Sequence, residues 1–175
     1  ELTRVADLNP LALDALSNRF PALETTASIE LLLEDESIDA IAICTPVETH
    51  MELVQSSLNA GKHVFVEKPF GQDSELCNQL CNLADKKHLQ ILVGHVFLFN
   101  ESIIELKKII HSCEFGDLLH LEAHRTNLGP VRKDVNAVWD LSSHDLSIFD
   151  FLLDDLPSEV SCIGSCNLDP LNADT

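Results

Sequence analysis

Three apolar segments, within residues 39–46, 63–69 and 89–97, place the strongest constraint on how this chain can fold. Their apolar residues follow one another continuously instead of alternating with polar ones, as in strands that are buried on both faces of a sheet. A stretch with helical spacing of apolar residues separates each segment from the next. Strands that alternate with helices favour a parallel sheet covered by helices, so we predict an α/β fold.

Periodicity also predicts the remaining elements of the N-terminal half. Residues 2–7 fit the end of an earlier strand, and Asn9-Pro10 is a helix-start signal. Gly61 can close the third predicted helix and Ser74 can cap the fourth. The predicted helices span residues 8–20, 28–38, 47–62 and 74–88.

The pattern changes after Val96, where apolar and polar residues begin to alternate as in an open sheet with one face in water. The elements predicted there are helices over 100–112 and 139–153, strands over 116–127 and 157–167, and a polar loop over 128–137. We therefore predict a partial dinucleotide-binding domain over 1–97. A partial α+β domain for substrate binding and oligomerisation is predicted over 98–175.

The composition excludes some partners. A formal net charge of −18 argues against nucleic acid and anionic membranes, because both are bound through basic surfaces. No apolar run is long enough to cross a bilayer. The six cysteines form no C-x-x-C pair and are interpreted as free thiols of a cytoplasmic protein. Cys77/Cys81 and Cys162/Cys166 have the wrong spacing for structural zinc, so no metal is expected.

Two clusters follow neighbouring predicted strands. Thr45 and Pro46 end one strand and Lys68 and Pro69 end the next, so both clusters lie at the carboxyl edge where such sheets bind ligands. Pro69 biases Lys68 toward an extended backbone and permits a cis bond. The alternatives are a helix cap for Thr45 and a surface turn for Lys68.

The third cluster is Asp140 and His144, which are four residues apart on a predicted helix and therefore share a face. A carboxylate against an imidazole fixes its tautomer and favours its charged form, which gives an acid/base group near neutral pH. Alternatively, Asp140 only caps the helix and His144 is a core histidine.

A doubly wound domain that binds a dinucleotide carries a glycine-rich turn about 20 residues before an acid at the end of its second strand. Asp7 occupies the position of that acid, and no G-x-G-x-x-G occurs in the sequence. We expect the turn to lie in a segment before Glu1, or else the domain to be of another kind.

The stretch from Cys44 to Gly71, CTPVETHMELVQSSLNAGKHVFVEKPFG, resembles the Gfo/Idh/MocA oxidoreductases, the family of glucose-fructose oxidoreductase and inositol dehydrogenase. Gly94-His95 and WDLSSHDLSI are also similar to family counterparts, and the similarity extends from Asp7 to Asn167. The resemblance implies a Rossmann-like parallel sheet, here without its first strand and glycine loop. It also implies the start of an α+β domain whose open sheet often forms an oligomer interface.

The resemblance implies roles for individual residues. Lys68 would contact the substrate hydroxyl and assist proton transfer, and His144 would be the acid/base that Asp140 orients. Asp7 would hold the adenosine ribose and repel a 2′-phosphate, which favours NAD over NADP. The implied cofactor-binding set is Asp7, Thr45, Pro46, His50, Glu67, Lys68 and His95.

The substrate contacts are less transferable. Many family members carry an arginine and a proline after the sixth strand, where this chain has Leu98 and Glu101. The stretch 124–140 is similar to a subgroup that acts on nucleotide sugars or builds cell-surface polysaccharide. The substrate-binding candidates are Arg125, Asn127, Arg132 and Trp139, with a solvated loop as the alternative interpretation.

The resemblance thus implies an NAD-dependent oxidoreductase that moves a hydride between nicotinamide and a hydroxyl carbon of a sugar, nucleotide sugar or cyclitol. A homo-oligomer is expected at full length, and these 175 residues alone are expected to be inactive. The alternatives are a non-catalytic dinucleotide-binding regulator of the same fold and an inactive fragment. The presence of all three of Lys68, Asp140 and His144 favours the enzyme.

Overall fold

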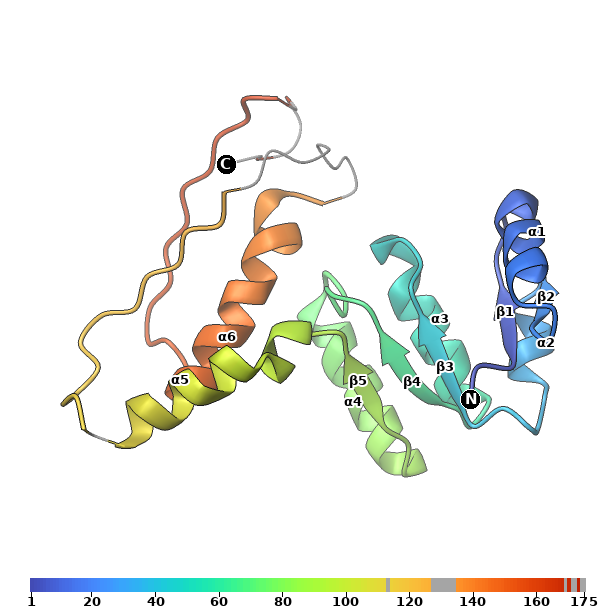
Figure 1. Cartoon of the computed structure of the whole chain (residues 1–175), viewed down its shortest axis with the longest axis horizontal. Helices are drawn as coiled ribbons and strands as arrows, with labels where there is room; N and C mark the ends of the chain where they lie inside the picture. Colours follow the sequence, from blue (N-terminus) through green and yellow to red (C-terminus); the bar gives the residue numbers. More distant parts are fainter. Residues whose placement is uncertain (113, 127–134, 169, 171–172, 174–175) are drawn as a thin grey trace. The chain divides into compact units, whose positions relative to one another are not determined.

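The chain forms two compact units in the computed structural model (Figure 1). The described residues are 1–112, 114–126, 135–168, 170 and 173. The first unit contains Glu1–Thr45, Thr49–Val66 and Asp73–Leu92. The second unit contains Pro46–Glu48, Glu67–Gln72 and Val93–Thr175, so two loops from the N-terminal half belong to it.

The strands confirm the predicted α/β class. Strand β1 (Arg4–Ala6) pairs in parallel with β2 (Glu24–Thr26). A separate three-stranded sheet has the order β3 (Ala40–Ile43), β4 (His63–Val66) and β5 (Ile91–Val93), and its first two strands are parallel. Strand β2 was not predicted, because its sequence Glu-Thr-Thr carries no apolar signal.

Strands β3 and β4 supply the centre of the core. Their register aligns Ile41 with Val64 and Ile43 with Val66, and all four side chains are at most 5% exposed. The two alanines of β3 are exposed, so this strand is buried on one face only, whereas the sequence predicted burial on both.

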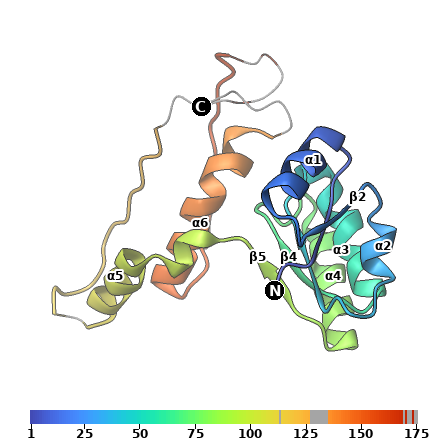
Figure 2. The same ribbon diagram turned by 45° about the vertical axis from the view of Figure 1, so that its right-hand side comes forward.

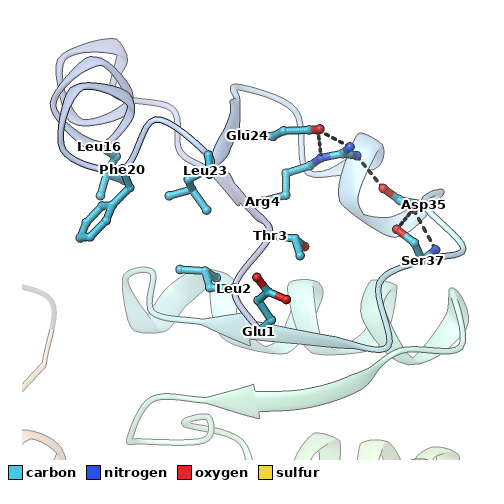
Figure 3. Close-up of a pocket in the computed structure, with 11 residues that line it drawn as sticks. Glu1, Leu2, Thr3, Arg4, Leu16, Phe20, Leu23, Glu24, Asp35 and Ser37 are labelled. Carbon is cyan, nitrogen blue, oxygen red and sulfur yellow. Dashed lines mark hydrogen bonds and ion pairs between the residues drawn. The ribbon is translucent and has the colours of Figure 1, made fainter.

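The exposure of β3 has a physical cause, because a cavity of about 600 Å³ separates β3 from β1. The cavity is lined by residues 1–6 on one side and 38–43 on the other. Figure 3 shows a second pocket, of about 580 Å³, which shares the first four residues. Arg4 lies there between Glu24 and Asp35 and forms ion pairs with both.

The helices of the first unit lie where the sequence predicted them, but the second covers only four residues where 28–38 were predicted. They are α1 (Pro10–Arg19), α2 (Glu30–Leu33), α3 (His50–Asn59, after a 3₁₀ turn at Val47–Thr49) and α4 (Ser74–Lys87). Helix α3 buries Val54 and Leu58, and α4 buries Leu80 and Ala84; each pair is four residues apart and forms an apolar stripe. Gly61 closes α3 with a φ of +76°, a conformation that favours glycine.

The cap of α4 corrects one prediction. The carboxylate of Asp73, not the hydroxyl of Ser74, accepts a hydrogen bond from the N–H of Leu76 at 3.0 Å. Asp73 has the extended backbone of an N-cap residue, whereas Ser74 is already the first residue of the helix.

Beyond β5, the regular elements in the described part of the second unit are helical (Figure 2). It contains a 3₁₀ turn at Val96–Phe99, α5 (Glu101–Ser112), a π-helical turn at Val138–Ser142 and α6 (Ser143–Leu153). Helices α5 and α6 pack together, and Lys107 bonds Asp154 just after α6 at 2.5 Å. Among the described helices, none combines the length and apolarity that a membrane crossing requires.

Two predicted strands are wrong. The described residues of 116–127 and 157–167 are irregular, and Leu119 and Ile163 are 93% and 97% exposed. An isolated strand is unstable, because its backbone and its apolar face both need a neighbouring strand. Neither segment has such a partner among the described residues.

Among the described cysteines, Cys77, Cys81, Cys162 and Cys166 are free thiols, as predicted for them. Cys113 lies outside the described residues.

The cap assignment predicts a difference between two neighbouring substitutions. Asp73→Ala should lower the free energy of unfolding by about 1 kcal/mol, because it removes the acceptor for a backbone N–H at the start of α4. Ser74→Ala, the matched control, should change it by less than about 0.5 kcal/mol. Urea unfolding followed by circular dichroism measures both, and a larger effect of Ser74→Ala would contradict the assignment.

Candidate active site

The side chain of Lys68 is hydrogen-bonded to Asp140, which lies in the turn before α6. Its Nζ donates hydrogen bonds to the main-chain oxygen of Asp140 at 2.6 Å and to Oδ1 of Asp140 at 3.1 Å. The two side chains are only 15% and 27% exposed. The Lys68–Pro69 peptide bond is cis, and the adjacent Glu67 accepts the N–H of Lys68 at 3.3 Å. Lys68 is therefore a partly buried, fixed cation, unlike the mobile lysine of a surface turn.

The backbone around Asp140 is unusual. Asp140 lies in the π-helical turn Val138–Ser142, and His144 follows in the first turn of α6. Single π-turns inside helices are rare and occur frequently at functional sites. The sequence predicted one continuous helix here, because apolar periodicity does not distinguish a π-turn from an α-turn.

His144 is surrounded by cations and apolar groups. Its ring meets the ring of Phe97 edge-on, with centroids 4.9 Å apart and an interplanar angle of 78°. Burial lowers the pKa of His144 below its usual 6.5, and the charges of Lys68, Arg125 and His95 lower it further, while Asp145 acts in the opposite sense. The net direction of the pKa shift is opposite to the one expected from a carboxylate beside the imidazole, because burial and the three cations outweigh Asp145. The carboxylate of Asp140 lies against the Lys68 ammonium.

Three buried polar atoms of this unit have no hydrogen-bond partner within the described part of the chain: Nδ1 of His95, Nδ1 of His144 and Oγ of Ser143. His95 follows β5, and burial lowers its pKa as well. An unpaired buried polar group costs about 1–3 kcal/mol, so these groups make this part of the second unit a candidate ligand site. Imidazole nitrogens and a hydroxyl suit a polyhydroxyl substrate or a carboxamide, which fits the nicotinamide end of a dinucleotide.

Other predicted cofactor residues lie in the first unit. Asp7 is exposed just after β1, and its Oδ1 accepts the N–H of Asn9 at 2.7 Å. An exposed carboxylate anchored in this way is a suitable acceptor for ribose hydroxyls. Thr45 is exposed after β3, and its hydroxyl lies 2.7 Å from that of Thr49.

His50 and Pro46 differ in exposure. His50 is 1% exposed, and its Nε2 donates a hydrogen bond to the carbonyl of Thr45 at 2.9 Å. This buried ring supports the turn after β3 from inside the first unit. Pro46, by contrast, is exposed and belongs to the second unit.

The substrate-binding candidates have different surroundings. Arg125 forms a two-pronged ion pair with Asp145, with Nη2–Oδ1 and Nε–Oδ2 distances of 2.7 and 3.0 Å. Trp139 is 37% exposed, and its main-chain N–H donates a hydrogen bond to Oδ1 of Asn136. Asn127 and Arg132 lie outside the described residues.

Sequence reasoning missed Asp145 and Phe97. The acid directly after His144 was a visible signal for the first. Phe97 could not be singled out, because it is one of several apolar residues in its segment. Within the described chain, no group of three or more His, Cys, Asp or Glu side chains is arranged to hold a metal.

The comparisons with known proteins agree in the family they point to. Residues 1–95 match the Gfo/Idh/MocA family model, described as an oxidoreductase family with an NAD-binding Rossmann fold. UDP-N-acetylglucosamine 3-dehydrogenase of Acidithiobacillus ferrooxidans is 32% identical over 138 residues, which are 78% of this chain and 42% of that protein. Inositol 2-dehydrogenase of Rhizobium meliloti is 26% identical over 174 residues, which are 96% of this chain and 52% of that protein.

A solved structure agrees with these relatives. The crystal structure of an NAD-binding protein from Listeria innocua matches with a TM-score of 0.80 and 28% identity, over 88% of this chain and 48% of that one. The chain thus spans about half or less of the length of the relatives named here. Because the family model matches more than half of these 175 residues, the chain belongs to the Gfo/Idh/MocA family of oxidoreductases with an NAD-binding Rossmann fold.

Proposed function

We propose that this chain carries the catalytic residues of an NAD-dependent dehydrogenase acting on a hydroxyl carbon of a sugar, nucleotide sugar or cyclitol. The observation that carries the proposal is the contact between Lys68 and Asp140 in the same unit as a buried, unpaired nitrogen of His144. A non-catalytic protein would have no need to bury these polar groups together. The names of the two dehydrogenase relatives support the substrate class.

The proposed chemistry follows from the charges. His144 is a base, because its lowered pKa leaves the imidazole neutral and able to accept the proton of a substrate hydroxyl. The Lys68 ammonium stabilises the negative charge that develops on the substrate oxygen. Asp140 fixes the Lys68 ammonium through its main-chain and carboxylate oxygens. NAD, when bound, supplies the hydride acceptor.

For the cofactor, we propose Asp7 for the adenosine ribose and His95 for the nicotinamide end. The exposed carboxylate of Asp7 can accept hydrogen bonds from ribose hydroxyls and would repel a 2′-phosphate, which favours NAD over NADP. Thr45 and Pro46 are proposed as further contacts and Glu67 as a neighbour of Lys68, while the buried ring of His50 supports the Thr45 turn.

Lys68→Ala tests the proposed ammonium in the intact protein that contains this chain. Turnover should fall roughly a hundredfold or more while the Kd for NAD stays within about tenfold, because the ammonium acts mainly on the transition state. Stopped-flow turnover and calorimetric NAD binding measure the two quantities. Lys86→Ala, on the exposed last turn of α4, is the matched control. Unchanged turnover in Lys68→Ala would remove this residue from the mechanism.

The lowered pKa of His144 predicts a pH dependence. The neutral imidazole is the active form, so kcat should fall only as pH drops through a pKa below 6.5 and should be flat above it until another group titrates. His144→Gln should lose this fall of kcat at low pH, the acidic limb of the pH profile, together with most of the activity. His120→Gln, at an exposed histidine, should keep both. A limb above pH 6.5 in the parent protein would contradict the assignment.

Asp7→Ser tests the cofactor preference. Removal of the carboxylate should shift the ratio of NAD to NADP affinity toward NADP by about tenfold or more, which corresponds to ~1.4 kcal/mol. Asp14→Asn, at an exposed acid of α1, is the control for a general change in charge. Titration of both cofactors by fluorescence measures the ratio. An unchanged ratio would separate Asp7 from the ribose site.

A further inference from the structure

The Arg125–Asp145 pair occupies an unexpected place in the second unit. Asp145 belongs to α6 and directly follows His144, whereas Arg125 comes from the irregular segment before the π-turn. Their side chains are 28% and 19% exposed, and the carboxylate holds Nε and Nη2 of the guanidinium at 2.7–3.3 Å. Such a two-pronged, partly buried pair is among the stronger polar contacts in proteins.

Phe97 connects this pair to His144. The guanidinium carbon of Arg125 lies 5.0 Å from the centre of the Phe97 ring, and the same ring meets the His144 imidazole at 4.9 Å. A guanidinium over an aromatic ring is attracted to its π-face, which limits the positions that the ring can adopt. Arg125 therefore acts on His144 through Phe97 as well as through its charge.

We propose that Arg125 and Asp145 are a positioning pair, which fixes Phe97 against His144 and balances the charge around its imidazole, rather than a substrate contact and a surface acid. This inference rests on the proposed role of His144 as the base. Two of the three guanidinium nitrogens are held by Asp145, which leaves little of Arg125 for a substrate. The charged and titratable groups around His144 are Lys68, His95, Arg125, Asp140 and Asp145.

The two charges of the Arg125–Asp145 pair act on the pKa of His144, which a purely structural contact would not do. Arg125 lowers the pKa of His144 and Asp145 raises it, so the two charges oppose each other. Asp145→Asn leaves the guanidinium uncompensated and should lower the His144 pKa. Arg125→Met keeps an apolar stem over Phe97, leaves the carboxylate uncompensated and should raise the pKa. Loss of packing alone would admit water in both variants and move both pKa values in the same direction, toward 6.5.

The experiment is an NMR titration of the histidine side chains in this chain, without cofactor or substrate, with His144→Gln to assign the signal. We expect shifts of about 0.5–1 pKa unit, downward in Asp145→Asn and upward in Arg125→Met, and a double variant that lies between them. Asp150→Asn, at an exposed acid of the same helix, should leave the pKa unchanged. Shifts in the same direction, or no shift, would overturn the proposal.

A kinetic measurement on the intact protein separates positioning from substrate binding. In a positioning role, Arg125→Met shifts the acidic limb of kcat upward and leaves KM within about threefold, and Arg125→Lys restores the limb in part. A large rise in KM with an unshifted limb would instead make Arg125 a substrate contact and overturn the proposal. The titration needs no catalysis. If the expected pKa shifts are found but the intact protein has no dehydrogenase activity, only the proposed function is refuted.

Discussion

The contact between the Lys68 ammonium and Asp140 joins two segments of the second unit that are 72 residues apart in sequence. It connects the loop after β4 to the π-helical turn before α6, and thereby sets where both residues point. A lysine in a surface turn would lose side-chain entropy on being fixed, at up to about 2 kcal/mol. Here two hydrogen bonds from the ammonium to one residue, both charge-assisted, offset that cost.

The same contact helps to explain why the pKa of His144 is lowered. Since the Asp140 carboxylate lies against Lys68, and Asp145 lies against Arg125, both nearby acids have a cationic partner. Burial and the remaining positive field then favour the uncharged imidazole. In the proposed mechanism this arrangement supplies a fixed ammonium and an uncharged base, the combination that removal of a proton from an alcohol requires.

Much of the fold could be predicted from local pattern. The helices α1, α3, α4, α5 and α6 and the strands β3 and β4 followed from periodicity and end signals, and Lys68 and His144 from their motifs. Strand β2 and the cap at Asp73 were missed because short polar segments carry little signal. Residues 116–127 and 157–167 were wrongly predicted as strands, because alternation reports the form of a strand and not the presence of its partner.

The sequence by itself determined the α/β class, the family and the candidate site residues, since apolar spacing and short motifs are local properties of the chain. Only the tertiary structure decided which carboxylate faces which cation. The sequence does not distinguish Asp140 from Asp145 as partners for a cation. In the folded chain, Asp140 pairs with Lys68, 72 residues away, and Asp145 pairs with Arg125, 20 residues away. The direction in which the pKa of His144 shifts depends on this pairing, because the shift is the sum of burial and of the charges that folding brings near the imidazole.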